Sequence, residues 1–107
     1  MQNEDPTSSI IIAYLLRPGD NLSYLAQKFN TEIEVLKNLN PNFDSIKPGM
    51  HLKIPVRYLH IVKYVDELPL IVARYQSDEI EILKANDLGS RILIVGSELI
   101  IPLNSKK

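Results

Sequence analysis

An internal duplication constrains this chain most, because two copies of one sequence pattern imply two copies of one fold. A shift of 46 positions superposes one group of residues, and a shift of 47 superposes a second group after a one-residue insertion. The first group pairs Leu22, Leu25, Ala26, Phe29, Leu36, Leu39 and Asn40 with Leu68, Ile71, Val72, Tyr75, Ile82, Ala85 and Asn86. The second group pairs Gly49, Leu52, Ile54 and Pro55 with Gly96, Leu99, Ile101 and Pro102. Chance does not readily produce both groups, so the chain is a tandem repeat.

Each copy has the pattern of a strand, two helices and a second strand. The expected opening strands are 11–16 and 59–64, and the expected closing strands are 50–54 and 98–101, ended by Pro55 and Pro102. Apolar residues at i, i+3, i+4 and i+7 from Leu22 predict the first helix, with Asp20 or Asn21 as its N-cap. Thr31 and Glu34 form a capping-box signature for the second helix, and Ser77 or Asp78 caps its counterpart.

The predicted fold class is α+β, with two tandem βααβ units. Each unit is expected to be a two-stranded antiparallel sheet with two helices on one face, because distant strands must pair and be covered. We expect a first module over residues 10–56, a second over 59–104, and flexible termini at 1–9 and 105–107. The link over 56–58 is too short for a free tether, so the modules should hold a fixed orientation.

Charge and composition exclude several classes of partner. Twelve basic and thirteen acidic residues give a net charge of -1, which argues against nucleic acid and against a polybasic membrane anchor. The absence of cysteine removes thiolate catalysis, zinc–thiolate sites and disulfides. His51 and His60 stand apart from other metal-ligating residues, so we expect neither a metal site nor a cofactor.

The N-terminal region gives no signal for membrane insertion. The apolar run over 10–16 is far shorter than the roughly 20 residues that span a bilayer, and it follows Glu4 and Asp5 rather than basic residues. We therefore expect a cytoplasmic protein if Met1 is the native start. If the chain is an excised fragment of a bacterial wall protein, we expect the cell envelope.

The first copy resembles the LysM (lysin motif) domain. The resemblance rests on ordered landmarks across residues 12–55: Pro18, Gly19, Asp20 and Leu22, then Leu25, Ala26 and Phe29, then Asn40, Pro41 and Asn42, then Lys47, Pro48 and Gly49, then Leu52, Ile54 and Pro55. Asn21 replaces the usual Thr or Ser, and an asparagine can still cap a helix. The second copy keeps the framework, but Tyr64 and Val65 replace the Pro–Gly pair. It resembles a diverged module of the same family.

The resemblance implies non-catalytic binding of N-acetylglucosamine-containing polymers, with peptidoglycan ahead of chitin. In this family the sugar lies in a shallow groove between the loop after the first strand and the loop after the second helix. Carried over to this chain, the glycan-binding residues are Gly19, Asp20, Asn21, Leu22, Asn42, Phe43, Asp44, Ser45 and Ile46. A candidate second site comprises Val65, Asp66, Glu67, Leu88, Gly89, Ser90 and Ile92.

Several of these residues also have structural interpretations. We favour Asp20 and its counterpart Asp66 as helix N-caps over ligand contacts. Asn40 and Asn86 are expected to end their helices, and Phe43 is either a sugar platform or part of the core. For glycoside hydrolysis, which needs two carboxylates, Asp20 and Asp44 on facing loops are the only pair worth naming; neither lies in a catalytic motif, so we expect no enzyme.

A second function remains open, namely that of a LysM-fold adaptor for proteins in a cell-envelope, spore-coat or phage-type assembly. Because fold does not determine function, the altered loop of the second copy keeps this alternative in place. Val65, Leu68, Pro69 and Leu70 could form the patch for a protein partner. A mixed protein, with sugar on the first copy and a partner on the second, is also consistent with the sequence.

Overall fold

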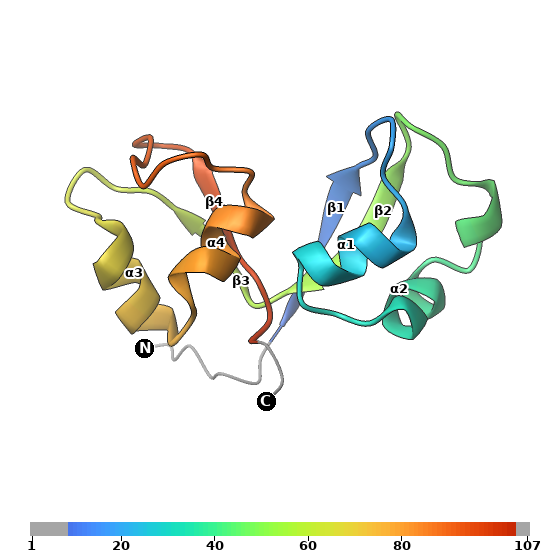
Figure 1. Ribbon diagram of the computed structural model, residues 1–107, viewed down its shortest axis with the longest axis horizontal. Helices are drawn as coiled ribbons and strands as arrows, with labels where there is room; N and C mark the ends of the chain where they lie inside the picture. The colour runs from blue at the N-terminus through green and yellow to red at the C-terminus, as the bar shows by residue number, and fades with distance from the viewer. Residues whose placement is uncertain (1–8, 105–107) are drawn as a thin grey trace.

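The structure, a computed structural model, describes residues 9–104 and contains the two expected βααβ units (Figure 1). Module 1 comprises β1 (Ile10–Leu15), α1 (Leu22–Lys28), α2 (Ile33–Leu39), the 3₁₀ turn η1 (Phe43–Ser45) and β2 (His51–Val56). Module 2 comprises β3 (Tyr58–Ile61), α3 (Leu68–Tyr75), α4 (Glu79–Ala85) and β4 (Glu98–Ile101). Apart from Ser9, the predicted flexible termini lie outside the described residues. No helix within residues 9–104 is long and apolar enough to cross a membrane.

Each module has one two-stranded antiparallel sheet, which confirms the predicted pairing. In module 1 the register places Ile10 opposite Val56, and in module 2 it places Tyr58 opposite Ile101. Both helices of a module lie on the same side of its sheet (Figure 1). Pro55 does not end β2 as predicted but lies within it, opposite Ile11. A two-stranded sheet has only edge strands, where a residue without an N–H is tolerated.

The helix starts follow the predicted caps in α1 and α4 and differ in α2 and α3, whose N-caps are Glu32 and Glu67. The side chain of Asn21 accepts the Tyr24 N–H at 2.8 Å and caps α1, and Asp78 caps α4. The predicted capping box at Thr31 is wrong, because the N-cap of α2 is Glu32 and no side chain caps that helix. The Thr31 N–H instead donates to the Ala26 carbonyl at 2.9 Å and closes the end of α1.

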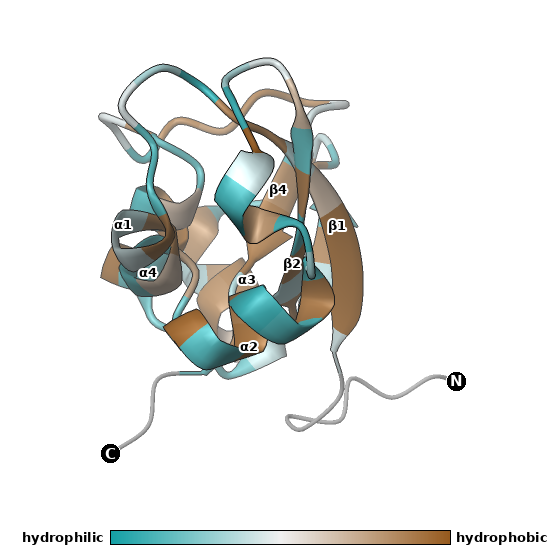
Figure 2. Ribbon diagram, turned by 90° about the vertical axis from the view of Figure 1, so that its right-hand side faces the viewer, coloured by the Kyte–Doolittle hydropathy of each residue, from teal (hydrophilic) through white to brown (hydrophobic). Residues whose placement is uncertain are grey.

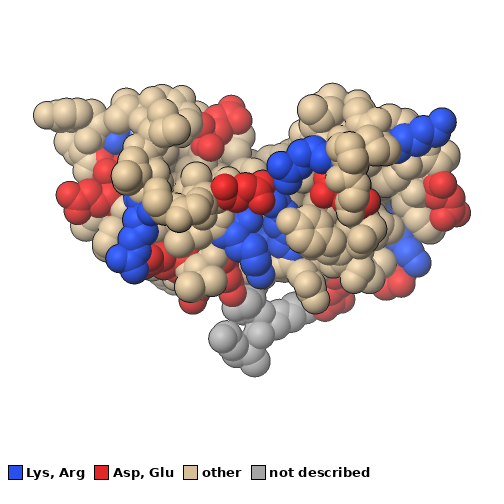
Figure 3. All heavy atoms as spheres, turned by 45° about the horizontal axis from the view of Figure 1, so that its top comes forward, with Lys and Arg blue, Asp and Glu red and all other residues tan. Residues whose placement is uncertain are grey.

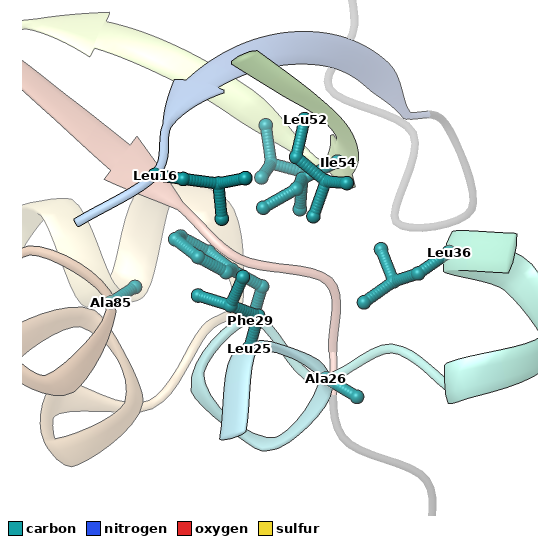
Figure 4. Packing of buried hydrophobic residues seen from close by; sticks show 9 residues of the cluster. Leu16, Leu25, Ala26, Phe29, Leu36, Leu52, Ile54 and Ala85 are labelled. Atoms are coloured by element: carbon teal, nitrogen blue, oxygen red, sulfur yellow. The ribbon is translucent and has the colours of Figure 1, made fainter. Parts of the chain in front are cut away.

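Each module buries one apolar cluster between its sheet and helices. Phe29 and Tyr75 are fully buried, as the helical spacing predicted. The sheets and the helix sides that cover them include strongly hydrophobic residues (Figure 2). The module 1 cluster comprises Leu16, Leu25, Ala26, Phe29, Leu36, Leu52, Ile54, Val56 and also Ala85 from α4 (Figure 4). Module 2 therefore completes the core of module 1.

An asparagine at the end of each second helix ties that helix to the closing strand. Asn40 donates to the Leu36 carbonyl at 2.8 Å and to the Lys53 carbonyl at 2.9 Å, and it accepts the Lys53 N–H at 2.9 Å. Asn86 makes the corresponding three bonds with Ile82 and Ile100. The two asparagines therefore end their helices, as predicted, and also fix the helix against the sheet.

The modules contact each other through several polar bonds as well as through Ala85. Arg57 alone separates β2 from β3, and its buried N–H donates to the Ile101 carbonyl at 2.8 Å. The Asn30 side chain donates to the Leu103 carbonyl at 2.8 Å. Lys28 of α1, only 2 % exposed, forms an ion pair with Asp87, which follows α4. These contacts agree with the fixed orientation expected from the short link.

We predict that Asn40→Ala lowers the free energy of unfolding by about 1–3 kcal/mol, because it removes the bonds of the Asn40 side chain to the Leu36 carbonyl and to the N–H and carbonyl of Lys53. Urea denaturation followed by circular dichroism measures the change. Asn38→Ala, at an exposed position of the same helix, is the matched control and should leave stability unchanged or slightly raised. Equal stability of Asn40→Ala and wild type would contradict the structural role of Asn40.

We also predict that Asp87→Asn destabilises the chain, because it leaves the buried Lys28 ammonium without its ion-pair partner. The side chain of Asp87 is itself 49 % exposed, so the expected loss is about 1–3 kcal/mol, below that of a fully buried pair. The same denaturation assay measures it. Asp78→Asn is the control, because asparagine still caps α4. If Asp78→Asn lowered the free energy of unfolding as much as Asp87→Asn does, the destabilisation would come from module 2 alone and not from the contact with Lys28.

Candidate functional site

A groove of about 230 Å³ lies in module 1 between the loop after β1 and the loop that contains η1. Its lining combines an apolar floor with a polar rim. The floor and walls are Leu16, Leu22, Leu25, Phe43, Ile46 and Pro48, and the rim is Arg17, Asp20, Asn21 and Lys47. The groove therefore offers apolar contact and several hydrogen-bonding groups.

The groove includes some of the sequence-predicted residues and omits others. Those that line it are Asp20, Asn21, Leu22, Phe43 and Ile46; those that do not are Gly19, Asn42, Asp44 and Ser45. Phe43, Asp44 and Ser45 form one turn of 3₁₀ helix, in which successive side chains point about 120° apart. One of the three can therefore reach the groove while its neighbours lie elsewhere.

Sequence reasoning missed five lining residues, namely Leu16, Arg17, Leu25, Lys47 and Pro48. The spacing assigned Leu25 to the core, and it is both buried and part of the groove floor. Lys47 and Pro48 belong to the pattern that carries the family resemblance, which was the signal available for them. Arg17 has no such signal, because its position depends on contacts with distant residues.

Asp20 braces the loop after β1 rather than capping α1. Its Oδ2 accepts the Arg17 N–H at 2.9 Å and the Tyr14 hydroxyl at 3.0 Å. Gly19 lies at the bend with φ of 92°, a conformation that a side chain would strain. The predicted N-cap role of Asp20 is therefore wrong, because its carboxylate is engaged by the strand and loop that precede it.

The rim of this groove is linked to module 2 through Arg17. Arg17 Nη2 donates to the Tyr14 hydroxyl at 3.1 Å and to Asp87 Oδ2 at 3.1 Å. The bond with Tyr14, helped by Asp87, raises the pKa of Arg17, so it stays cationic. Burial raises the pKa of the Tyr14 hydroxyl, so it stays protonated at neutral pH and donates a hydrogen bond to Asp20.

A second groove of about 230 Å³ lies at the corresponding place in module 2. Of the seven predicted residues, Asp66 and Glu67 line it; Val65, Leu88, Gly89, Ser90 and Ile92 do not. Its other lining residues are Val62, Lys63, Tyr64, Leu68, Pro69, Arg91, Leu93 and Val95. Leu88 packs against the module 2 core instead, in a loop that is one residue longer than its counterpart and contains no 3₁₀ turn.

The loop brace of module 2 uses different side chains in the same positions. His60 stands where module 1 has Tyr14, and its Nε2 lies 2.7 Å from Asp66 Oδ2. Its Nδ1 lies 2.7 Å from the hydroxyl of Tyr75, which stands where module 1 has Phe29. A buried imidazole has two ring nitrogens to satisfy, and the phenol supplies the second partner that a phenylalanine lacks. The Lys63 N–H completes the brace on Asp66 at 2.7 Å, so Asp66 is not a helix cap either.

The bend itself also differs between the two loops. Both are closed by a backbone bond, from Asp20 N–H to Arg17 O at 3.1 Å and from Asp66 N–H to Lys63 O at 2.9 Å. Val65 replaces Gly19 and, unlike Gly19, does not adopt a positive φ. Tyr64 and Val65 are 87 % and 70 % exposed, so the module 2 loop presents apolar side chains to solvent.

Within residues 9–104 no group of three or more His, Cys, Asp or Glu side chains could hold a metal ion. The carboxylate pair considered for hydrolysis is also not assembled at one groove. Asp20 lines the groove with its Oδ2 engaged by two donors, whereas Asp44 is exposed and outside the lining.

The brace on Asp66 predicts a pH dependence of stability. The hydrogen bond from His60, with that from the Lys63 N–H, lowers the pKa of Asp66 below its ordinary 3.8. Charged Asp66 therefore stabilises the fold fully above pH 3.8, and this contribution is lost as the pH falls through the lower, folded-state pKa.

We expect the stability difference between wild type and Asp66→Asn to shrink as the pH is lowered below 3.8, in urea denaturation at a series of pH values. Asp44→Asn, at an exposed loop position, is the control and should differ from wild type by a constant amount. A difference for Asp66→Asn that is the same at every pH would contradict the brace.

Comparison with known proteins identifies the family of the chain. The family model described as LysM domain matches the chain twice, over residues 14–55 and 60–102. No curated protein matches the chain. Similar solved structures include the spore cortex-lytic enzymes SleL of Bacillus cereus and of Bacillus megaterium QM B1551.

The similarity to the Bacillus cereus enzyme has 24 % identity and a TM-score of 0.41, and it covers 94 % of this chain and 24 % of that one. The corresponding values for the Bacillus megaterium enzyme are 22 %, 0.44, 89 % and 23 %. The chain thus spans about a quarter of the length of these enzymes. The two family matches together cover well over half of the chain. The chain therefore belongs to the LysM domain family, whose domains are binding modules for glycans such as peptidoglycan, and it carries two tandem copies.

Proposed function

We propose that this chain is a non-catalytic carbohydrate-binding protein that holds N-acetylglucosamine-containing glycans in the module 1 groove. The observation that supports this proposal is the groove between the two loops where the family resemblance locates the sugar, with its apolar floor and polar rim. We propose 10–56 and 59–104 as the module boundaries, and the ranges matched by the family model lie inside them.

The groove chemistry fits an acetylated sugar. Phe43 and Ile46 offer apolar surface for an acetamido methyl group or the face of a pyranose ring. Asp20, Asn21 and the backbone of the loops offer hydrogen-bonding groups at the rim. The family resemblance implies a shallow groove, so affinity for a single site is expected to be weak.

We place peptidoglycan ahead of chitin as the ligand. Arg17 at the rim is paired with Asp87, whereas the exposed Lys47 forms no ion pair within residues 9–104 and offers an accessible cation. Peptidoglycan carries carboxylates on its lactyl ethers and peptide stems, whereas chitin is uncharged. The accessible ammonium of Lys47 therefore favours the acidic polymer.

Module 2 is the weaker candidate for sugar binding. Its groove has the same size but a different bend, and it includes Lys63, Arg91, Asp66 and Glu67. Avidity from two sites would require both grooves to bind at once. We therefore assign the primary glycan site to module 1.

The second candidate function is that of a protein-interaction adaptor that uses module 2. The observation that favours it is a group of exposed apolar residues on the loops beside the module 2 groove, comprising Tyr64, Val65, Ile92, Ile94 and Val95. Clustered exposed apolar side chains are typical of interaction surfaces. Leu68, considered earlier as part of such a patch, is buried in the module 2 core and cannot contribute.

We predict that titration with muropeptide or chitin oligomers shifts the backbone amides of residues 16–22 and 42–48 in NMR spectra of the labelled chain. Phe43→Leu should weaken binding about threefold to tenfold, because it removes the ring face and keeps apolar volume. Tyr64→Leu, the matched aromatic change in module 2, should leave affinity unchanged.

The same titration separates the alternatives. Shifts confined to module 2, with sensitivity to Tyr64→Leu alone, would move the glycan site to module 2. No shifts with millimolar oligomer of either glycan would contradict glycan binding and leave the adaptor function.

The adaptor function has its own test. A photo-crosslinking residue in place of Tyr64 should give a discrete protein adduct in the producing cell. The same residue in place of Tyr24, an exposed aromatic on α1, should give none. Identical patterns at both positions would count against a module 2 interaction surface.

A further inference from the structure

We propose that Asp87, which belongs to module 2, is a positioning residue for the glycan groove of module 1. The inference rests on the proposed function and extends it, because it gives module 2 a part in sugar binding that needs no sugar in its own groove. Asp87 lines no part of the module 1 groove and acts through Arg17, which does.

A continuous set of side-chain bonds runs from Asp87 to the groove rim. Asp87 Oδ2 accepts from Arg17 Nη2 at 3.1 Å, and the same nitrogen donates to the Tyr14 hydroxyl at 3.1 Å. The Tyr14 hydroxyl donates to Asp20 Oδ2 at 3.0 Å. Arg17 and Asp20 both line the groove, so an anchor in module 2 holds two rim residues of module 1.

Asp87 is a firm anchor because its own position is set by three features. Its Oδ1 binds the buried Lys28 ammonium, for which it is the ion-pair partner. Its backbone is left-handed, with φ of 54°, at the end of α4. Its N–H donates to the Lys84 carbonyl at 3.3 Å. Burial raises the pKa of Asp87, but the bonds from Lys28 and Arg17 outweigh it and hold that pKa below its ordinary value.

Arg17 needs such an anchor if it is to meet a ligand in one conformation. Its side chain is about half exposed, and a long exposed side chain samples many rotamers unless it is bonded. It lies where the module 1 groove meets the larger apolar groove between the modules, which β1 lines along its whole length. Figure 3 shows basic and acidic side chains adjoining over the hollow between the two lobes.

Comparison of the two copies shows that, among the described residues, the contact between Asp87 and Arg17 has no counterpart at the loop of module 2. The residue 46 positions after Arg17 is Lys63, and no ion pair of its side chain is found within residues 9–104. The brace of module 2 is completed internally by His60 and Tyr75. Module 1 thus depends on module 2 for its rim, whereas module 2 braces its own loop.

The first test compares the full chain with Asp87→Asn in the glycan titration, with Asp78→Asn as the matched control. Asp87→Asn should weaken binding about threefold to tenfold, the effect of one lost charge-assisted bond at the rim. Without ligand it should already shift the amides of residues 16–21. Asp78→Asn should bind as wild type does.

A second variant tests whether weaker binding by Asp87→Asn merely reflects a general loss of structure. Lys28→Met combined with Asp87→Asn removes the buried ammonium together with its partner, so no unpaired charge remains in the interface. This double variant should fold as wild type by circular dichroism and still bind about threefold to tenfold more weakly. If it is folded and binds as wild type does, the inference is overturned.

A double-mutant cycle with Arg17→Gln separates positioning from a merely structural effect. If Asp87 acts through Arg17, adding Asp87→Asn to Arg17→Gln should cause no further loss of affinity. Equal losses in both backgrounds would show that Asp87 does not act through Arg17. If wild type binds the glycan and Asp87→Asn binds it with the same affinity, the inference alone is overturned. If wild type binds neither glycan, the proposed function is overturned and the inference with it.

Discussion

A sheet of two strands cannot bury its own apolar face, and the rest of this structure follows from that constraint. Each sheet is covered by two short helices, and each second helix is held to the closing strand by an asparagine, Asn40 or Asn86. Even so, the module 1 core includes Ala85 from module 2. Small cores leave little stability to spare, so the contact between the modules is part of the fold rather than an addition to it.

The two modules show how a duplicated unit can keep a geometry while its side chains change. An aspartate braces the loop after the first strand in both, but the donor is a phenol in module 1 and an imidazole in module 2. The imidazole requires a second partner, and Tyr75 supplies it in place of Phe29. The two differences are coupled by one physical need, the satisfaction of buried polar atoms.

The two modules also differ in the surfaces on which their proposed functions rest. Module 1 keeps the Pro–Gly bend and a groove with an apolar floor, whereas module 2 presents apolar side chains on an altered loop. Asp87 joins these halves, because it neutralises a buried lysine of module 1 and holds an arginine at the rim of the module 1 groove. A module with a diverged loop can therefore still contribute to the site of its neighbour.

The sequence by itself determined the repeat, the order of strands and helices, the antiparallel pairing and the core aromatics Phe29 and Tyr75. These features depend on local periodicity and on the need to pair distant strands. It did not determine the start of the second helix, because the Thr31 N–H is taken by the end of α1. Nor did it determine the roles of Asp20 and His60, which depend on hydrogen bonds between separate elements. Only the tertiary structure placed Arg17 between Tyr14 and Asp87, since that contact joins residues 70 positions apart and no pattern within one repeat encodes it.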